Sequence, residues 1–251
     1  MSQFQYSQPL PLSYTPVGGG RKRKSSATYG SRKKAKTAVA RIPRPRFTSR
    51  VAPGAFPQKK RVTLSYVEYF STTPNISGGA AGKVFRMNGM QDPNFTDSGH
   101  QPLGYDQWSA FYNRYTVMSS KIVVSTSSIE PLVKGAITGI VIYNSGVALP
   151  STADIIGLSE DPDGCSGVVA HDGTPCVLTK NVDIAKFYSI SNPLEDDTLQ
   201  AAVSTNPARM AYAYVWHAVA PGTLTVGGLL TFQVRITYDV VFTEPKDLST
   251  S

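Results

Sequence analysis

The pattern of hydrophobic and polar residues changes near residue 60. Before that point no hydrophobic period can be followed. After it, short runs rich in β-branched and aromatic residues alternate with stretches of turn residues, which is typical of a β-rich chain. The runs predict strands within residues 61–70, 83–87, 115–127, 136–143, 175–179, 184–190, 209–219 and 230–243, and the stretch 145–167 is read as a long turn-rich region.

The last run has the most regular pattern. From Leu230 to Thr243 every even position is apolar, whereas the odd positions are polar except for Val241. This alternation predicts a long strand with one packed face and one polar face. Ala136 to Tyr143, "AITGIVIY", is instead a continuous apolar run, and it predicts a strand buried on both faces.

These elements predict an all-β fold. About eight strands joined by long loops, with almost no helix, fit a single jelly-roll antiparallel β-sandwich of eight strands that occupies residues 60–251. An immunoglobulin-like sandwich is shorter and has tighter spacing. No internal repeat is visible, which argues against a propeller or solenoid.

One segment departs from the strand pattern. In "GYDQWSAFYNRY", residues 104–115, four aromatic residues have the i, i+3, i+4, i+7 spacing of a helix: Trp108, Phe111, Tyr112 and Tyr115. Asp106 is expected at the N-cap of this turn. We expect these five residues to act as a structural anchor through packing, the alternative being a base-stacking site.

Charge is distributed very unevenly. Residues 1–61 contain 15 of the 25 Lys and Arg residues and no Asp or Glu, so the remaining residues carry a net charge of −7. Residues 1–59, here called the basic arm, are rich in Pro, Gly and Ser and poor in hydrophobic periodicity, so we predict that they are disordered. The chain is therefore expected to consist of a cationic arm and a mildly acidic body.

The basic arm carries the strongest functional signal. Cations without compensating carboxylates bind a polyanion and release its condensed counterions. The predicted nucleic-acid-binding residues are Arg21, Lys22, Arg23, Lys24, Arg32, Lys33, Lys34, Lys36, Arg41, Arg44, Arg46, Arg50, Lys59, Lys60 and Arg61. The alternative is a merely solvated tail. Arg21-Lys22 followed by "KKAKT" also matches a bipartite nuclear-import pattern.

No active site is predicted. The glycine-rich segment 77–84 lacks the first Gly and the Ser or Thr of a phosphate loop, and the three histidines are far apart in sequence. Asp97 to His100, "DSGH", is interpreted as a loop rather than part of a catalytic triad. "EDPDG", residues 160–164, is interpreted as an exposed acidic turn, with an inter-subunit ion site as the alternative. We therefore expect no enzyme activity, no metal and no cofactor.

Cysteine usage and hydropathy bear on the redox state of the protein and on membrane insertion. Cys165 and Cys176 are expected to be reduced thiols, with a disulfide as the alternative. The longest apolar runs are far shorter than the roughly 18 residues that a membrane-spanning helix needs, so no membrane insertion is expected.

The order of motifs resembles a known family. "KKRVTLSYVEYF" (Lys59 to Phe70), "GHQPLGYDQWSAFYNRYTVMSSKIVVS" (Gly99 to Ser125) and the exit "FTEPKD" (Phe242 to Asp247) are similar to capsid proteins of circular, Rep-encoding single-stranded DNA viruses, the circovirus-like group. The likeness covers most of the chain. It implies a jelly-roll shell domain, a short helical segment before its fourth strand, and a small icosahedral T=1 shell of sixty copies.

The resemblance also implies partners and locations. These are other copies of the chain, a single-stranded DNA genome, host nuclear import receptors and an unidentified cell-surface receptor, with the protein in the virion and, during assembly, in the host nucleus. Three alternatives stay open. They are the capsid of a small single-stranded RNA virus, a cellular nuclear β-sandwich that binds nucleic acid, and a sandwich enzyme such as a glycosidase, which would need paired carboxylates in a cleft.

Overall fold

A computed structural model describes residues 56–73, 79–128, 135–144, 154–170, 172, 174–219 and 228–247. The basic arm up to residue 55 lies outside the described residues. The strands are β1 (Lys59–Thr72), β2 (Ala81–Arg86), β3 (Tyr112–Ser128), β4 (Ala136–Asn144), β5 (Gly164–Val169), β6 (Cys176–Asp183), β7 (Gln200–Ala202), β8 (Ala211–Val219) and β9 (Leu230–Pro245). The helices are α1 (Tyr105–Ser109), α2 (Ile155–Glu160), α3 (Ile184–Phe187) and the 3₁₀ turn η1 (Pro193–Glu195).

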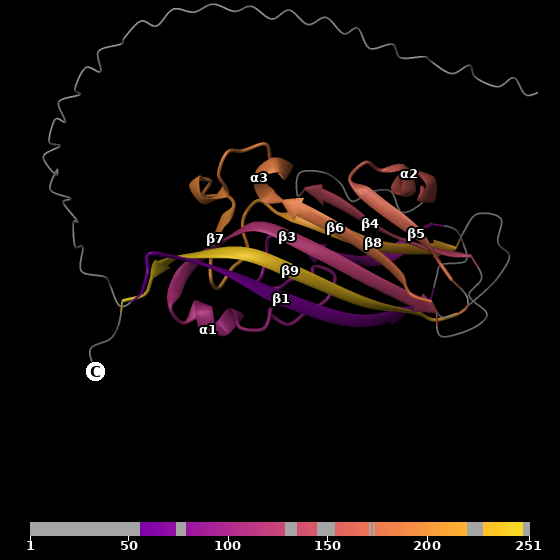
Figure 1. Ribbon diagram of the computed structural model, residues 1–251, viewed down its shortest axis with the longest axis horizontal. Helices are drawn as coiled ribbons and strands as arrows, with labels where there is room; N and C mark the ends of the chain where they lie inside the picture. Colours follow the sequence, from indigo (N-terminus) through magenta and orange to yellow (C-terminus); the bar gives the residue numbers. More distant parts are fainter. Residues whose placement is uncertain are drawn as a thin grey trace, which may run out of the picture. The chain divides into compact units, whose positions relative to one another are not determined.

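Eight of these strands form two facing antiparallel sheets. One has the order β1-β9-β3-β6, with the three-residue β7 added beside β3, and the other has the order β2-β8-β4-β5. Figure 1 shows β1, β9 and β3 side by side in the nearer layer and β4 and β8 behind them. The first four strands alternate between the sheets, and the last strand lies between the first and the third. This is the topology of a jelly roll, so the predicted fold class is confirmed.

Strand β9 supplies the centre of the core. All seven even positions from Leu230 to Phe242 are fully buried between the two sheets, as the alternation predicted. The strand pairs with β1 on one side and β3 on the other over nearly its whole length. A strand that is paired on both sides has its backbone N–H and C=O groups satisfied. The alternation of apolar and polar residues is therefore enough to predict which face of β9 packs in the core.

Two predictions along the chain were wrong. Residues 184–190, predicted as a strand, begin with the helix α3, because the Asp183 side chain accepts a hydrogen bond from the Lys186 backbone N–H at 3.2 Å and caps a helical turn. The turn-rich region 145–167 contains helix α2, which Asp154 caps through the Gly157 N–H at 2.8 Å, and the start of β5. Short capped helices of this kind carry too few residues for a periodic signal.

The four-stranded sheet is packed on both faces at its central strands β4 and β8, whereas its edge strand β5 leaves Val168 68% exposed. Its outer face carries a second hydrophobic cluster that includes Val141 of β4, Trp216 of β8 and Leu158 of α2. The Trp216 ring lies directly over Gly139, where an added Cβ would come within 2.3 Å of the ring. The predicted burial of β4 on both faces is thereby explained: one face meets the main core and the other meets this cluster.

The outer face of the five-stranded sheet has a different character. Its outward positions on β1, β9, β3 and β6 are mostly Ser, Thr and Val, with a few charged residues. In the part of the chain that the structure describes, this face remains open to solvent, since Tyr69 on β1 is 67% exposed and Val177 on β6 is 59% exposed. The outward positions of β1, β9, β3 and β6 are together called the open face.

Candidate nucleic-acid interface

The basic arm joins the sandwich at the start of β1. Lys59, Lys60 and Arg61 are all exposed and occupy the first three positions of the strand. The other twelve predicted nucleic-acid-binding residues, Arg21 to Arg50, lie outside the described residues. Residues 56–61, here called the root of the arm, are described by the structure. The residues around this root define the candidate interface.

Arg61 is already engaged by a carboxylate. Its Nε donates to Asp239 Oδ1 at 2.8 Å, and its second guanidinium nitrogen pairs with Asp239 Oδ2. The hydrogen bond from Arg61 lowers the pKa of Asp239, although partial burial opposes the shift. Asp239 thus offsets the charge of Arg61, whereas Lys59 and Lys60 have no ion-pair partner among the described residues.

The chain just before β1 is held by aromatic residues. The rings of Phe56 and Phe111 lie 4.7 Å apart between centroids, and the Tyr112 hydroxyl donates to the Pro57 carbonyl at 3.0 Å. The Lys60 ammonium lies 5.9 Å from the centre of the Trp108 ring, within the range of a cation–π contact. The aromatic segment therefore fixes the root of the arm on the body.

These aromatics surround one residue of β9. The ring centroids of Tyr112, Trp108 and Tyr115 lie 5.9, 6.0 and 6.4 Å from that of Phe242. Tyr112 and Tyr115 are buried, Trp108 packs against the core and Phe111 is 41% exposed. Tyr112, Tyr115 and Trp108 thus pack around the core, whereas Phe111 contacts Phe56. The anchor role of these residues stays a prediction.

The helical spacing of the four aromatics was misleading. Helix α1 ends at Ser109, and Tyr112 and Tyr115 belong to strand β3. The spacing therefore joins two different elements. Tyr105, which the sequence analysis did not single out, is the buried residue of the helix, and its hydroxyl donates to the Val203 carbonyl at 2.6 Å. Its position three residues before Trp108 was the available signal.

The predicted N-cap was also wrong. The helix follows a turn in which the Tyr105 N–H donates to the Pro102 carbonyl at 3.0 Å, with Gly104 at φ 88° and ψ −2°. These angles are those of the third residue of a type II turn, which favours glycine. Gly104 is thus the N-cap, Asp106 lies in the first turn, and no side chain caps the helix.

A hollow lies beside this turn. It has a volume of about 430 Å³ and is lined by Leu103, Gly104, Gln107, Trp108 and Phe111. Leu103, at the second position of the turn, is 89% exposed. The root of the arm therefore borders an apolar surface as well as the open face of the sheet.

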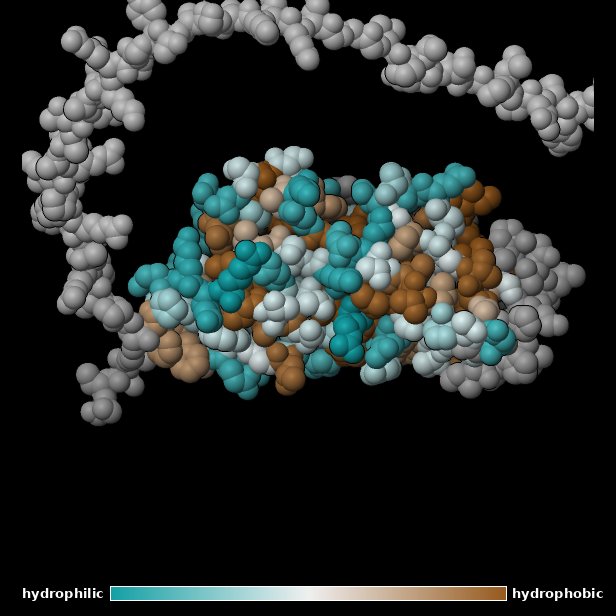
Figure 2. Space-filling model, viewed as in Figure 1, coloured by the Kyte–Doolittle hydropathy of each residue, from teal (hydrophilic) through white to brown (hydrophobic). Residues whose placement is uncertain are grey.

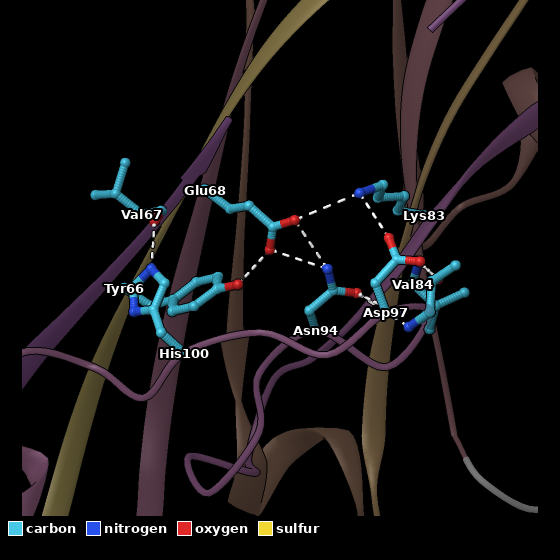
Figure 3. A network of polar contacts seen from close by, with 9 residues as sticks. Tyr66, Val67, Glu68, Lys83, Val84, Asn94, Asp97 and His100 are labelled. Carbon is cyan, nitrogen blue, oxygen red and sulfur yellow. Dashed lines mark hydrogen bonds and ion pairs between the residues drawn. The ribbon is translucent and has the colours of Figure 1, made fainter. Parts of the chain in front are cut away.

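A polar network closes the side of the sandwich where β1 and β2 form the sheet edges. Figure 3 shows the Glu68 carboxylate between Tyr66, Asn94 and Lys83. The Asn94 amide donates to both carboxylate oxygens, at 2.8 and 3.0 Å, and the Tyr66 hydroxyl donates to one of them. Lys83 Nζ lies 3.4 Å from Glu68 and 2.7 Å from Asp97. Because the carboxylate is fully engaged, the network has a structural role.

The electrostatics of the network follow from burial and pairing. Burial raises the pKa of Tyr66, and its hydrogen bond to Glu68 raises it further. Burial would lower the pKa of Lys83, but the hydrogen bond to Asp97 and the charge of Glu68 outweigh it and raise the pKa. The sequence did carry a signal for this site, because Glu68 occupies a core-facing position of an alternating strand.

"DSGH" is confirmed as a loop. His100 Nε2 lies 3.0 Å from the Val67 carbonyl oxygen and Asp97 binds Lys83, so the two residues have separate partners. Cys165 and Cys176 are free. Within the described ranges, no group of three His, Cys, Asp or Glu residues could hold a metal, and no helix is long and apolar enough to cross a membrane.

Comparison with known proteins gives similarity in structure alone. No protein-family model and no curated protein sequence matches the chain. The fold is similar to the decameric BFDV capsid protein, with 10% identity, a TM-score of 0.43 and coverage of 74% of this chain and 99% of that one. It is also similar to the tobacco necrosis virus structure, with 13% identity, a TM-score of 0.44 and coverage of 77% and 86%.

A third structure is a virus-like particle. It is that of the giant freshwater prawn Macrobrachium rosenbergii nodavirus, with 9% identity, a TM-score of 0.43 and coverage of 78% of this chain and 100% of that one. The structural neighbours are thus viral capsid proteins.

Proposed function

We propose that this chain is a viral capsid protein that assembles into a small icosahedral shell and packages a single-stranded DNA genome through its basic arm. The observation that carries the proposal is the joining of two parts: a jelly roll, and a segment with 15 cations and no carboxylate up to Arg61. The segment suits a polymer of phosphates, and the rigid sandwich suits symmetric contacts between copies.

The root of the arm supports this arrangement. When the arm is bound to a genome, any pull on the arm acts on the body at the point where the two are joined. Here the Phe56–Phe111 contact and the Tyr112–Pro57 hydrogen bond connect that point to the core around Phe242. The role proposed is structural and not enzymatic.

Two finer parts of the proposal rest on the sequence. The resemblance to the circovirus-like group favours DNA and a T=1 shell of sixty copies. The pattern from Arg21 to Thr37 favours host nuclear import receptors as partners and the host nucleus as the place of assembly. The cell-surface receptor belongs to the same proposal, with the protein otherwise in the virion.

Electron microscopy of the purified full-length protein tests the main proposal. We expect closed shells of uniform diameter, because a capsid protein associates through closed symmetry. A protein that stays monomeric or dimeric at high concentration with nucleic acid supplied would fit a cellular nucleic-acid-binding sandwich instead. Treating the extracted contents with DNase and RNase separately decides the genome type, and cargo sensitive only to RNase would replace DNA by RNA.

A further inference from the structure

Three side chains lie on a diagonal line across the open face. Tyr69 on β1 pairs with Gln233 on β9, and the next outward residue of β9 is Arg235. Arg235 in turn pairs with Val123 on β3, and the neighbouring outward residue of β3 is Lys121. Each member is a diagonal neighbour of the next, at roughly 7–8 Å.

The Tyr69 ring is exposed and yet held in place. Gln233 Nε2 donates to the Tyr69 hydroxyl at 2.7 Å, which ties the ring to the neighbouring strand. A ring that is ordered before binding loses less conformational entropy when a flat partner stacks on it. Nucleobases are such partners, and a base stacked on an aromatic side chain is bound without regard to its sequence.

The two cations on the line, Arg235 and Lys121, are exposed and form no ion pair within the described residues. The outward carboxylates of Asp183 and Asp239 are diagonal neighbours of Lys121. Each is paired with another cation, Lys186 and Arg61 respectively. Figure 2 shows hydrophilic and hydrophobic residues interleaved across this side of the molecule. The line therefore offers positive charge beside a stacking ring.

The face is also continuous with the root of the basic arm. Lys59 and Arg61 are outward residues of β1, like Tyr69 further along the same strand. A phosphate polymer that leaves the arm along β1 reaches the line directly. In a duplex the bases are already stacked on each other, so the ring suits an unpaired strand.

We infer that Tyr69, Arg235 and Lys121 form a binding site for single-stranded nucleic acid on the open face, with a base on the ring and phosphates on the two cations. This inference rests on the proposed function and names a second contact beyond the arm. Gln233 acts as a positioning residue, because it touches the ring and not the bound strand.

Photo-cross-linking of the full-length protein tests the site. Oligo(dT) substituted with 5-bromodeoxyuridine, and the matching 5-bromouridine RNA, are irradiated with the protein, and adducts are mapped by mass spectrometry. We expect an adduct at Tyr69. Arg235→Gln and Lys121→Gln should each lower its yield several-fold. Tyr69→Phe keeps the ring but loses the hydrogen bond from Gln233, so it should lower the yield by a smaller factor. Thr179→Ala, on the same face but off the line, serves as the matched control.

Binding measurements complete the test. Tyr69→Ala should weaken binding of a short single strand about tenfold, in line with base stacking. Each lost cation should lower the slope of log affinity against log salt by about one. Circular dichroism verifies that each variant is folded.

The outcomes separate this inference from the proposed function. Adducts confined to the arm, with an affinity for the single strand that is unchanged in Tyr69→Ala, Arg235→Gln and Lys121→Gln, would overturn the site. Genome binding by the arm would stay intact. Absence of any nucleic-acid binding would remove both proposals.

Discussion

Gly139 shows how a missing side chain decides the packing of a whole sheet. The Trp216 ring occupies the space above it, with ring atoms at 2.3 to 2.5 Å from the position of an added Cβ. Real Cβ contacts do not come this close, and the tryptophan is fully buried, so the ring cannot move away easily.

Gly139→Ala should therefore destabilise the fold. Overpacking in a close-packed core costs about 1–3 kcal/mol, measured as a lower midpoint of denaturant unfolding. In the double variant with Trp216→Leu, the alanine should cost much less, because the ring that it strikes is gone. Equal costs of the alanine in both backgrounds would contradict this packing explanation.

His217 is a buried titratable residue of β8. It is almost fully buried, and its ring lies 5.4 Å from that of Phe232 in the main core. Burial lowers its pKa from 6.5 to about 4, and the nearby backbone of Thr73 opposes the shift only in part. The folded protein thus holds this imidazole neutral over a range in which the unfolded chain takes up a proton.

Stability should fall with acid because of this residue. The contribution of the neutral imidazole is fully present above pH 6.5 and is lost as the pH falls toward 4, by up to about 3 kcal/mol. Urea unfolding of the wild type and of His217→Gln between pH 7 and pH 4 measures it. The variant should show the shallower loss, and parallel curves for the two proteins would refute the assignment.

At the scale of elements, the sheet edge at β1 and β2 is closed by side chains. Glu68 faces inward from β1 and Lys83 from β2, with side-chain exposures of 17% and 23%. Asn94 connects them to the following loop, since its side-chain oxygen accepts from the backbone N–H groups of Thr96 and Asp97 at 3.0 and 3.1 Å. The network therefore fixes one loop to both sheets.

Glu68→Gln should loosen this edge. Removing one partner of a partly buried ion pair leaves the other charge less compensated, and we expect a loss of about 1–3 kcal/mol in unfolding free energy. Lys83→Met in the Glu68→Gln background should cost less than Lys83→Met alone. Additive losses in a denaturant-based double-mutant cycle would show that the two residues do not act together.

At the scale of the whole molecule, the two sheets have different roles. The four-stranded sheet carries hydrophobic clusters on both faces of its central strands, whereas the five-stranded sheet keeps an outer face open next to the arm root. Twelve of the 15 cations up to Arg61 precede residue 51, and the body after Arg61 carries a net charge of −7. Non-specific binding of nucleic acid should thus depend mainly on the arm.

Deletion of residues 1–50 should separate the two parts. We expect a folded body with an unchanged far-ultraviolet spectrum of its strands and with nucleic-acid packaging abolished, because the counterion-releasing charges are lost. The absorbance ratio at 260 and 280 nm of purified particles measures the packaged cargo. Arm-less particles that carry as much nucleic acid as the intact protein would contradict the role of the arm.

Much of the fold could be predicted because its signals are local. The alternation in β9 and the apolar run of β4 each reside in neighbouring residues, and burial followed both of them. Local signals failed at the boundaries of elements. The aromatic spacing crossed from α1 into β3, and Asp183 turned an apolar segment into a capped helix.

The sequence by itself determined an all-β sandwich preceded by a cationic segment, since hydrophobic period and charge are properties of adjacent residues. Only the tertiary structure decided which side chains meet. Tyr69 and Arg235 come together because the last strand pairs with the first, and Glu68 meets Lys83 because their strands lie at the same side of two different sheets. Such contacts depend on long-range pairing, which no period along the chain contains.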